Sequence, residues 1–192
     1  MTLAIQPRMT LAEFDEWASK QYDRNYEFIG GEVVEVVSNS LASRVTFKIG
    51  GFLFAYLQTH PIGEATTADG GYMVNGERYI PDIGFIHNER MMGKVDSPYY
   101  PIAPDLAVEV ISNPNNHQEM RDLRIKLVNY LSAGTTVWVI DPFSRTAEIY
   151  TPNQPVQTFD DTGILSGGTV LPNFSLALRD VLPPTDATPA HE

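Results

Sequence analysis

The sequence lacks cysteine altogether, and none of its apolar stretches approaches the roughly 18 residues that suggest a membrane span. Without cysteine, disulfide bonds and metal sites built from thiolates are excluded. The N-terminal stretch also lacks a long apolar run followed by a cleavage-site pattern, so it does not resemble a secretory signal. Together these absences predict a cytoplasmic protein without a membrane segment.

Basic residues are scarce as well. Lysine and arginine together number 13 against 24 aspartates and glutamates, which gives a formal net charge of -11. Indiscriminate binding to the phosphate backbone of nucleic acid needs a large basic surface, and this composition argues against one. A local basic patch beside a metal ion, which itself supplies positive charge, is compatible with the composition.

Length and composition indicate a single domain over residues 1–182. A chain of 192 residues is long enough to bury a sizeable core, and 43% hydrophobic and 19% charged residues are ordinary values for a globular protein. From Pro183 onward the chain is rich in proline, threonine and alanine. Residues 183–192 are therefore predicted to form a disordered tail.

The hydrophobic periodicity predicts an α/β fold, with a mixed sheet flanked by helices. The expected elements are a helix over 10–20, a hairpin over 26–37, a helix over 43–58 capped by Ser43, strands over 63–74, 79–87 and 105–112, a helix over 118–133, and strands over 137–140 and 147–151. Asn75-Gly76 predicts a hairpin turn. Gly50-Gly51, inside the second helix, costs about 1 kcal/mol per glycine relative to alanine and indicates close packing against an unidentified neighbour.

Three acidic residues, Glu27, Asp82 and Glu109, each interrupt an apolar run that is predicted to be a strand. Burying a lone carboxylate is costly, so each needs a partner, a metal ion or an exposed strand face. Simple exposure to solvent is the alternative for any one of them. Exposure to solvent suits Glu109 least, because the apolar residues around Glu109 are typical of a strand buried on both faces.

Strand geometry favours Asp82 over Asp105 as the partner of Glu109. Asp105 and Glu109 lie on one face of one strand, but four residues at about 3.3 Å each separate them by roughly 13 Å. Oxygen ligands lie about 2.0–2.6 Å from a divalent ion, so two carboxylates that far apart cannot share one. Asp82 belongs to a different strand and can meet Glu109 across the sheet.

The predicted third helix supplies the basic cluster of the chain, Arg121, Arg124 and Lys126. On a helical wheel, Lys126 lies at one border of the apolar face and Arg124 near the other, so either can bury its stem and present its charge at the sheet edge. Ordinary solvated helix charges are the alternative. His87 and His117 have no ligand-like spacing, and we do not assign them to the site.

Five stretches of the sequence resemble the Uma2 (DUF820) group of endonucleases. They are YEFIGGE at 26–32, IPDIGFI at 80–86, PDLAVEVIS at 104–112, KLVNYLSAG at 126–134 and VWVIDP at 137–142. No single stretch is specific, but their order and spacing together are, and the resemblance runs from about residue 10 to residue 180. It implies a restriction endonuclease-like core, a mixed sheet flanked by helices.

The resemblance also implies a PD-(D/E)XK site. Asp82, which follows Pro81, matches the first acidic residue, and Glu109 matches the second. Ile111 stands where a lysine is expected, so the resemblance assigns that role to Lys126 of the following helix and makes Glu27 an additional carboxylate. The implied cofactor is Mg²⁺ or Mn²⁺ held by Asp82 and Glu109. DNA is the implied substrate, and a homodimer is expected, although the sequence does not reveal its interface.

The resulting hypothesis is a metal-dependent endonuclease that hydrolyses phosphodiester bonds in DNA. Lys126 orients the nucleophile or stabilises developing negative charge, and Glu27 orients a ligand or water, or binds a second ion. Two alternatives stay open. One is an inactive nuclease fold that serves as a binding or assembly module, and the other is a metal-dependent hydrolase of small phosphodiesters.

Overall fold

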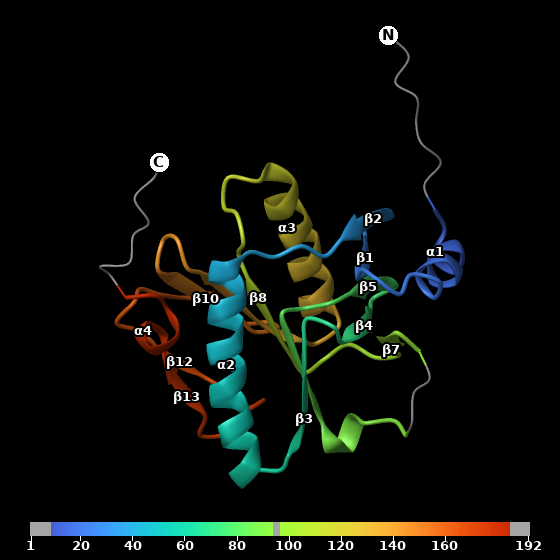
Figure 1. The fold of residues 1–192 in the computed structure, drawn as a ribbon. Coiled ribbons are helices and arrows are strands. Elements are labelled where there is room, and N and C mark those ends of the chain that lie inside the picture. Colours follow the sequence, from blue (N-terminus) through green and yellow to red (C-terminus); the bar gives the residue numbers. More distant parts are fainter. Residues whose placement is uncertain (1–8, 94–96, 185–192) are drawn as a thin grey trace.

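A computed structural model describes residues 9–93 and 97–184 of the chain. Most of the tail predicted over 183–192 thus lies outside the described residues, and the domain boundary at residue 182 stays a prediction. The helices are α1 (Leu11–Ala18), α2 (Ser40–Thr59), α3 (His117–Ser132), α4 (Leu178–Val181) and a short 3-10 helix at Asn88–Arg90 (Figure 1). The strands are β1 (Tyr26–Ile29), β2 (Glu32–Glu35), β3 (Gly63–Thr67), β4 (Gly71–Val74), β5 (Glu77–Tyr79), β6 (Ile83–His87), β7 (Tyr99–Tyr100), β8 (Leu106–Val110), β9 (Thr136–Asp141), β10 (Thr146–Tyr150), β11 (Gln157–Phe159), β12 (Ile164–Ser166) and β13 (Ser175–Ala177).

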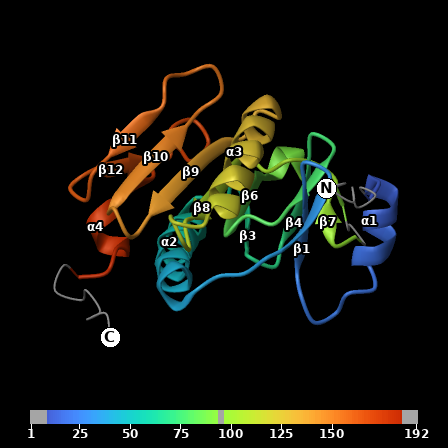
Figure 2. The same cartoon turned by 90° about the horizontal axis from the view of Figure 1, so that it is seen from above.

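The strands of the described residues form two mixed sheets and one small antiparallel pair. The larger sheet has the order β11-β10-β9-β8-β6-β3, the smaller sheet has the order β2-β1-β5-β4-β7, and β12 pairs with β13. In the larger sheet β8 and β9 are parallel, and α3 makes the crossover between them. Figure 2 shows α2 and α3 on opposite faces of this sheet. The predicted fold class, a mixed sheet flanked by helices, is confirmed.

The long hairpin predicted around Asn75-Gly76 is divided between the smaller and the larger sheet. Both turn residues have positive φ, as the predicted turn requires. The predicted strands 63–74 and 79–87 are each divided in two, with β4 and β5 in the smaller sheet and β3 and β6 in the larger one. Pro81 lacks the N–H that would continue the ladder, so the chain bends between β5 and β6. Asp82 lies at this bend.

Helix α2 begins at Ser40, three residues before the predicted start. The side-chain oxygen of Asn39 accepts hydrogen bonds from the N–H groups of Leu41 and Ala42, both at 2.9 Å. Ser43 therefore lies inside the helix, and its prediction as the cap is wrong. Asparagine and serine are comparable N-cap residues. Asn39 directly precedes Ser40, the first residue of α2, and so occupies the N-cap position.

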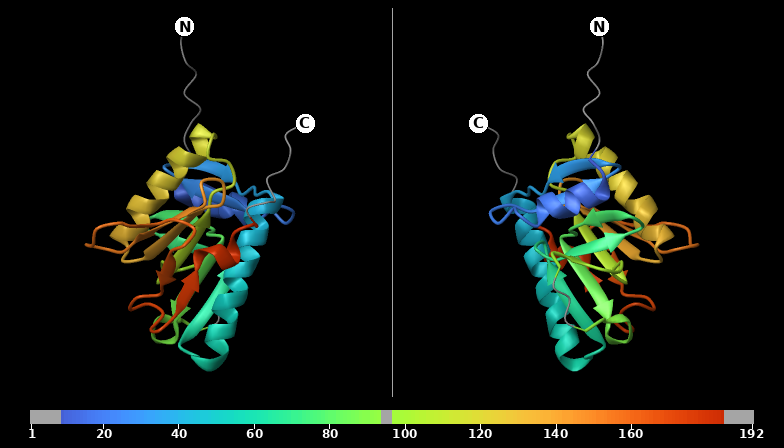
Figure 3. Two further views of the ribbon diagram at one scale, coloured as in Figure 1. Left: turned by 90° about the vertical axis from the view of Figure 1, so that its left-hand side faces the viewer. Right: turned by 90° about the vertical axis from the view of Figure 1, so that its right-hand side faces the viewer.

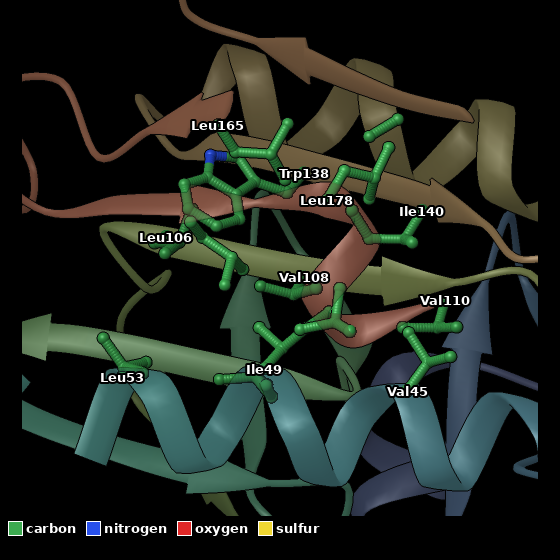
Figure 4. Packing of buried hydrophobic residues seen from close by; sticks show 14 of the residues in the cluster. Val45, Ile49, Leu53, Leu106, Val108, Val110, Trp138, Ile140, Leu165 and Leu178 are labelled. Atoms are coloured by element: carbon green, nitrogen blue, oxygen red, sulfur yellow. The ribbon is translucent and has the colours of Figure 1, made fainter. Parts of the chain in front are cut away.

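Successive residues of β8 face different helices, as the period of two in a strand requires. One hydrophobic cluster holds Val45, Ile49 and Leu53 of α2 together with Leu106, Val108 and Val110 of β8 (Figure 4). Ala107 belongs to a second cluster with Tyr130 of α3. Glu109 has the same parity as Ala107, and it lies on the face of the sheet that α3 covers.

Candidate functional site

A cavity of about 190 Å³ brings together the four side chains of the predicted site. Glu27 comes from β1, Asp82 from the bend before β6, Glu109 from β8 and Lys126 from α3. The cavity is bounded on one side by the hairpin of β1 and β2 and on the other by the first turns of α3. Four segments that are distant in sequence thus meet at one place, as the sequence-based hypothesis requires.

Lys126 joins the two glutamates of the cluster. Its ammonium nitrogen lies 2.9 Å from Oε1 of Glu27 and 2.7 Å from Oε1 of Glu109. The second oxygen of Glu109 accepts a hydrogen bond from the same nitrogen at 2.8 Å. The hydroxyl of Tyr130, one turn further along α3, donates to Oε1 of Glu109 at 3.2 Å. Glu109 is therefore fixed by two side chains of the helix that covers it.

Burial and neighbouring charge set the protonation of this cluster. Burial raises the pKa of Glu109 to about 7, with the negative charges of Glu27 and Asp82 acting in the same direction and Lys126 opposing them. Burial alone would lower the pKa of Lys126, but Glu109 and Glu27 outweigh it and hold that pKa above its ordinary value. Lys126 is accordingly an ammonium ion at neutral pH.

Backbone N–H groups hold the other two carboxylates in place. The N–H of Ile80 donates to Oε1 of Glu27 at 2.6 Å, and the N–H of Val110 donates to Oδ2 of Asp82 at 2.7 Å. Burial raises the pKa of Asp82, and the hydrogen bond from Val110 acts against that shift. Both carboxylates are therefore oriented by the ends of strands, which are rigid parts of the fold.

Simple exposure to solvent does not describe these acids. Glu27 is 6% exposed, and the side chain of Glu109 is 13% exposed. Asp82 is half-buried and opens into the cavity. The cost of burying the two glutamates is offset by Lys126, so the cluster is an electrostatic unit.

Asp105 takes part in a different set of contacts. Its carboxylate pairs with the guanidinium of Arg90 at 2.6 Å and with Nδ1 of His87 at 3.2 Å. It also accepts the N–H of His87 at 2.8 Å. Asp105 does not line the cavity that contains Glu109. The geometric choice of Asp82 over Asp105 therefore agrees with the arrangement of the chain.

Helix α3 carries a polar stripe that the sequence analysis missed. Gln118, Asp122 and Lys126 follow one another at four-residue spacing, and all three line the cavity. The amide of Gln118 donates to both oxygens of Asp122, at 2.9 and 3.0 Å, and Asp122 is buried. A search of the sequence for polar residues four apart would have found this stripe, because such residues share one helix face.

The basic residues of α3 differ in their surroundings. Lys126 is one of three buried residues of the helix and lies well inside its covered face, so the predicted border position is wrong. The carboxylates of Glu27 and Glu109, which pair with Lys126, compensate for the burial of its charge. Arg121 is exposed and pairs with Glu32 of β2 at 2.7 Å, and Arg124 is exposed. Neither arginine lines the cavity.

The donor set of the cavity fits a hard divalent cation. Six carboxylates line it, whereas Lys126 is its one basic side chain within the described part of the chain. The acidic residues are Glu27, Glu35, Asp82, Glu109, Glu119 and Asp122. Among the residues in 9–93 and 97–184, no three histidine, aspartate or glutamate side chains are grouped so as to hold a metal ion by themselves. An ion bound here would therefore take two carboxylates and complete its shell with water, as Mg²⁺ commonly does.

Comparison with known proteins agrees with this arrangement. The model of the family Uma2, described as "Putative restriction endonuclease", matches residues 11–179. The chain belongs to the Uma2 family. Among solved structures, it is similar to the crystal structure of "a putative nuclease belonging to DUF820" from Anabaena variabilis ATCC 29413, with a TM-score of 0.77 and 20% identity over 90% of this chain and 97% of that chain. This likeness confirms the predicted nuclease-like fold. No curated protein matches the chain.

The described helices of this Uma2 protein do not include one that is long and apolar enough to span a membrane.

Proposed function

We propose that this Uma2 protein is a metal-dependent endonuclease that hydrolyses phosphodiester bonds in DNA in the cytoplasm. The proposal depends on one observation, the cluster of three acidic side chains and one ammonium group in a single cavity. A buried ion pair contributes little to stability compared with apolar residues of similar size. Stability of the fold therefore does not account for this buried cluster of charges, whereas a role in hydrolysing a phosphodiester would account for it.

Asp82 and Glu109 are the proposed ligands of Mg²⁺ or Mn²⁺. When Glu27, Asp82 and Glu109 are all ionised, their three negative charges exceed the one positive charge of Lys126, and a divalent ion would balance the remainder. Their oxygens are the donors that hard cations prefer. Such an ion, when bound, would polarise the phosphate and lower the pKa of a bound water.

Lys126 acts in this proposal as a fixed positive charge. Because its pKa is raised, it keeps its proton at neutral pH and stabilises negative charge that develops on the phosphate. Glu27 acts as a positioning residue, since it contacts the Lys126 nitrogen at 2.9 Å and is itself fixed by the N–H of Ile80. Tyr130 positions Glu109 in the same way.

The charge of the molecule makes a prediction about the substrate. With a net charge of -11, the chain as a whole repels a polyanion. The proposed metal ion supplies local positive charge where the scissile phosphate would lie. Binding of DNA should therefore depend on the metal.

An inactive binding module is the second candidate. It is favoured by the contacts of Lys126 with both oxygens of Glu109, at 2.7 and 2.8 Å. In that case the ammonium group is the permanent counter-ion of the site and no metal binds.

The test is cleavage of supercoiled plasmid and of short oligonucleotides in the presence of Mg²⁺ or Mn²⁺. Asp82→Ala should lower metal-dependent cleavage at least about 100-fold, because it removes a metal ligand. Asp105→Asn is the matched control: Asp105 also follows a proline but lies outside the cavity, so cleavage should be retained. Circular dichroism would establish that both variants fold.

Three results would overturn the proposal, each in its own way. Cleavage by Asp82→Ala at the wild-type rate would exclude this site. Hydrolysis of a simple phosphodiester without cleavage of DNA would assign a small substrate. DNA bound but left intact with every divalent ion tried would identify the inactive module.

A further inference from the structure

We infer that the outward face of α2 is the interface of a symmetric homodimer in which the two α2 helices pack antiparallel. Six residues define this face, which we call the α2 seam: Ser40, Arg44, Phe47, Gly51, Phe54 and Gln58. All six are exposed. Their spacing alternates between four and three residues, which keeps one side of a helix turned toward a partner helix. The inference concerns assembly and does not depend on the proposed hydrolysis.

The α2 seam exposes large apolar side chains. Phe47 is 80% exposed and Phe54 is 65% exposed, and they lie two turns apart on the side of α2 opposite its buried residues. Figure 3 shows α2 along the outer edge of the molecule, with none of the described helices over its outward side. A single exposed apolar residue is ordinary, but two on one helix face form a patch of the kind that marks an interaction surface.

Gly51 lies between these two phenylalanines. Glycine inside a helix is unfavourable relative to alanine, so its presence calls for a packing reason. A Cβ atom built at Gly51 would meet nothing within 4 Å, and one at Gly50 would meet only Cδ1 of Ile83, at an ordinary 3.8 Å. Packing among the described residues 9–93 and 97–184 therefore does not require glycine at either position. A second copy of the chain would supply the close neighbour that the Gly50-Gly51 pair predicts.

An antiparallel pair whose two-fold axis crosses the seam at the level of residue 49, midway between Phe47 and Gly51, makes the seam complementary to itself. Phe47 then lies opposite Gly51 of the partner subunit, so that each bulky ring enters the space left by a missing side chain. Arg44 lies opposite Phe54 of the partner subunit, where a guanidinium can stack on the ring. The two-fold symmetry forms each of these contacts twice in the dimer. A parallel pair would instead place Arg44 against Arg44 and leave a gap between the glycines.

The charge pattern also favours a second copy of this chain as the partner. Residues 36–63 contain no aspartate or glutamate, in a chain whose net charge is -11. Two copies with this net charge repel one another, and this repulsion is weakest where acidic residues are absent. The lysines and arginines of this stretch, Arg44 and Lys48, are too few to hold a nucleic acid backbone.

Sedimentation velocity of the full chain over a dilution series tests the inference. The wild type should sediment as a dimer of 42.8 kDa, which is twice the 21.4 kDa of one chain. Phe47→Glu should raise the dimer dissociation constant at least about 100-fold, because it buries a charge without a partner. Phe143→Glu, at an exposed phenylalanine outside the α2 seam, should leave the constant unchanged.

A swap of side chains tests the register itself. Phe47→Gly and Gly51→Phe should each weaken the dimer, one by leaving a gap and the other by a clash between rings. The double variant Phe47→Gly/Gly51→Phe restores one ring opposite one glycine, so its dissociation constant should return to within roughly tenfold of the wild type. Circular dichroism on each variant would show that α2 remains folded.

Several results would overturn the inference. These are a wild-type chain that stays monomeric throughout the series, a dimer that persists in Phe47→Glu, and a double variant no tighter than the single ones. A monomer that co-sediments with phosphatidylglycerol vesicles through Phe47 would assign the seam to a lipid surface instead.

Discussion

The side-chain nitrogen of Lys126 forms ion pairs with one carboxylate of the smaller sheet and one of the larger sheet. Glu27 belongs to β1 of the smaller sheet, and Glu109 belongs to β8 of the larger sheet. Removing the ammonium would leave two buried carboxylates without a counter-charge, which costs about 3–5 kcal/mol in comparable cases. Stability and activity are therefore linked at this residue, and loss of activity in a Lys126 variant is informative only beside a measurement of its stability.

Glu109 should make the stability of the metal-free protein depend on pH. Its pKa is about 7 in the folded chain against 4.5 for an ordinary glutamate, so the folded state holds a proton that the unfolded state has lost. The free energy of unfolding should therefore fall as the pH rises from 4.5 toward 7. Urea unfolding at pH 5 and pH 8 should show a loss about 1–3 kcal/mol larger for the wild type than for Glu109→Gln. An identical pH dependence of the two proteins would contradict the electrostatic account of the cluster.

The sequence alone was enough to select three of the four site residues as candidates. Glu27, Asp82 and Glu109 interrupt apolar runs, and a carboxylate in such a run needs a specific partner. Lys126 came from the family resemblance, because helical periodicity placed it at a border and not at the centre of the covered face. Asp122 is not found from the sequence when apolar residues alone define that face.

At the scale of elements, hydrogen bonding of side chains to the backbone decides where α2 begins. Asn39 caps the helix and Ser43 does not. Asn39→Ala should lower the free energy of unfolding by about 1 kcal/mol, since two N–H groups of the first turn lose their acceptor. Ser43→Ala is the control and should change it by less than about 0.5 kcal/mol, because Ser43 is exposed and already inside the helix. Equal effects of the two substitutions, measured by urea unfolding, would contradict the assignment of the cap.

The hairpin turn at Asn75-Gly76 and the capping box of α1 were predictable because their signals are local. In α1, Thr10 and Glu13 exchange the hydrogen bonds of that motif. The division of the hairpin between two sheets was not predictable in this way. It depends on the bend at Pro81 and on which strands are available to pair, and both are properties of the whole chain.

At the scale of the molecule, the candidate site lies between the two sheets and under α3, while the α2 seam lies on the outer side of α2. Val45, Ile49 and Leu53 of α2 pack against the face of β8 opposite Glu109. The cavity and the packed face of α2 therefore lie on opposite faces of β8, and Val37 and Ser38, which precede the seam, line the cavity. This arrangement allows a dimer and a hydrolytic site to coexist in one small chain.

Asp82 and Glu109 form the proposed metal site, and direct measurement of metal binding tests that site without any assumption about the substrate. Electron paramagnetic resonance of free Mn²⁺, titrated with the protein at pH 8, counts the bound ions. We expect the wild type and Asp105→Asn to bind Mn²⁺, and Asp82→Ala and Glu109→Gln to lose that binding, with all four proteins folded by circular dichroism. Equal binding of Mn²⁺ by the wild type and Asp82→Ala, or none by the folded wild type, would contradict the proposed site.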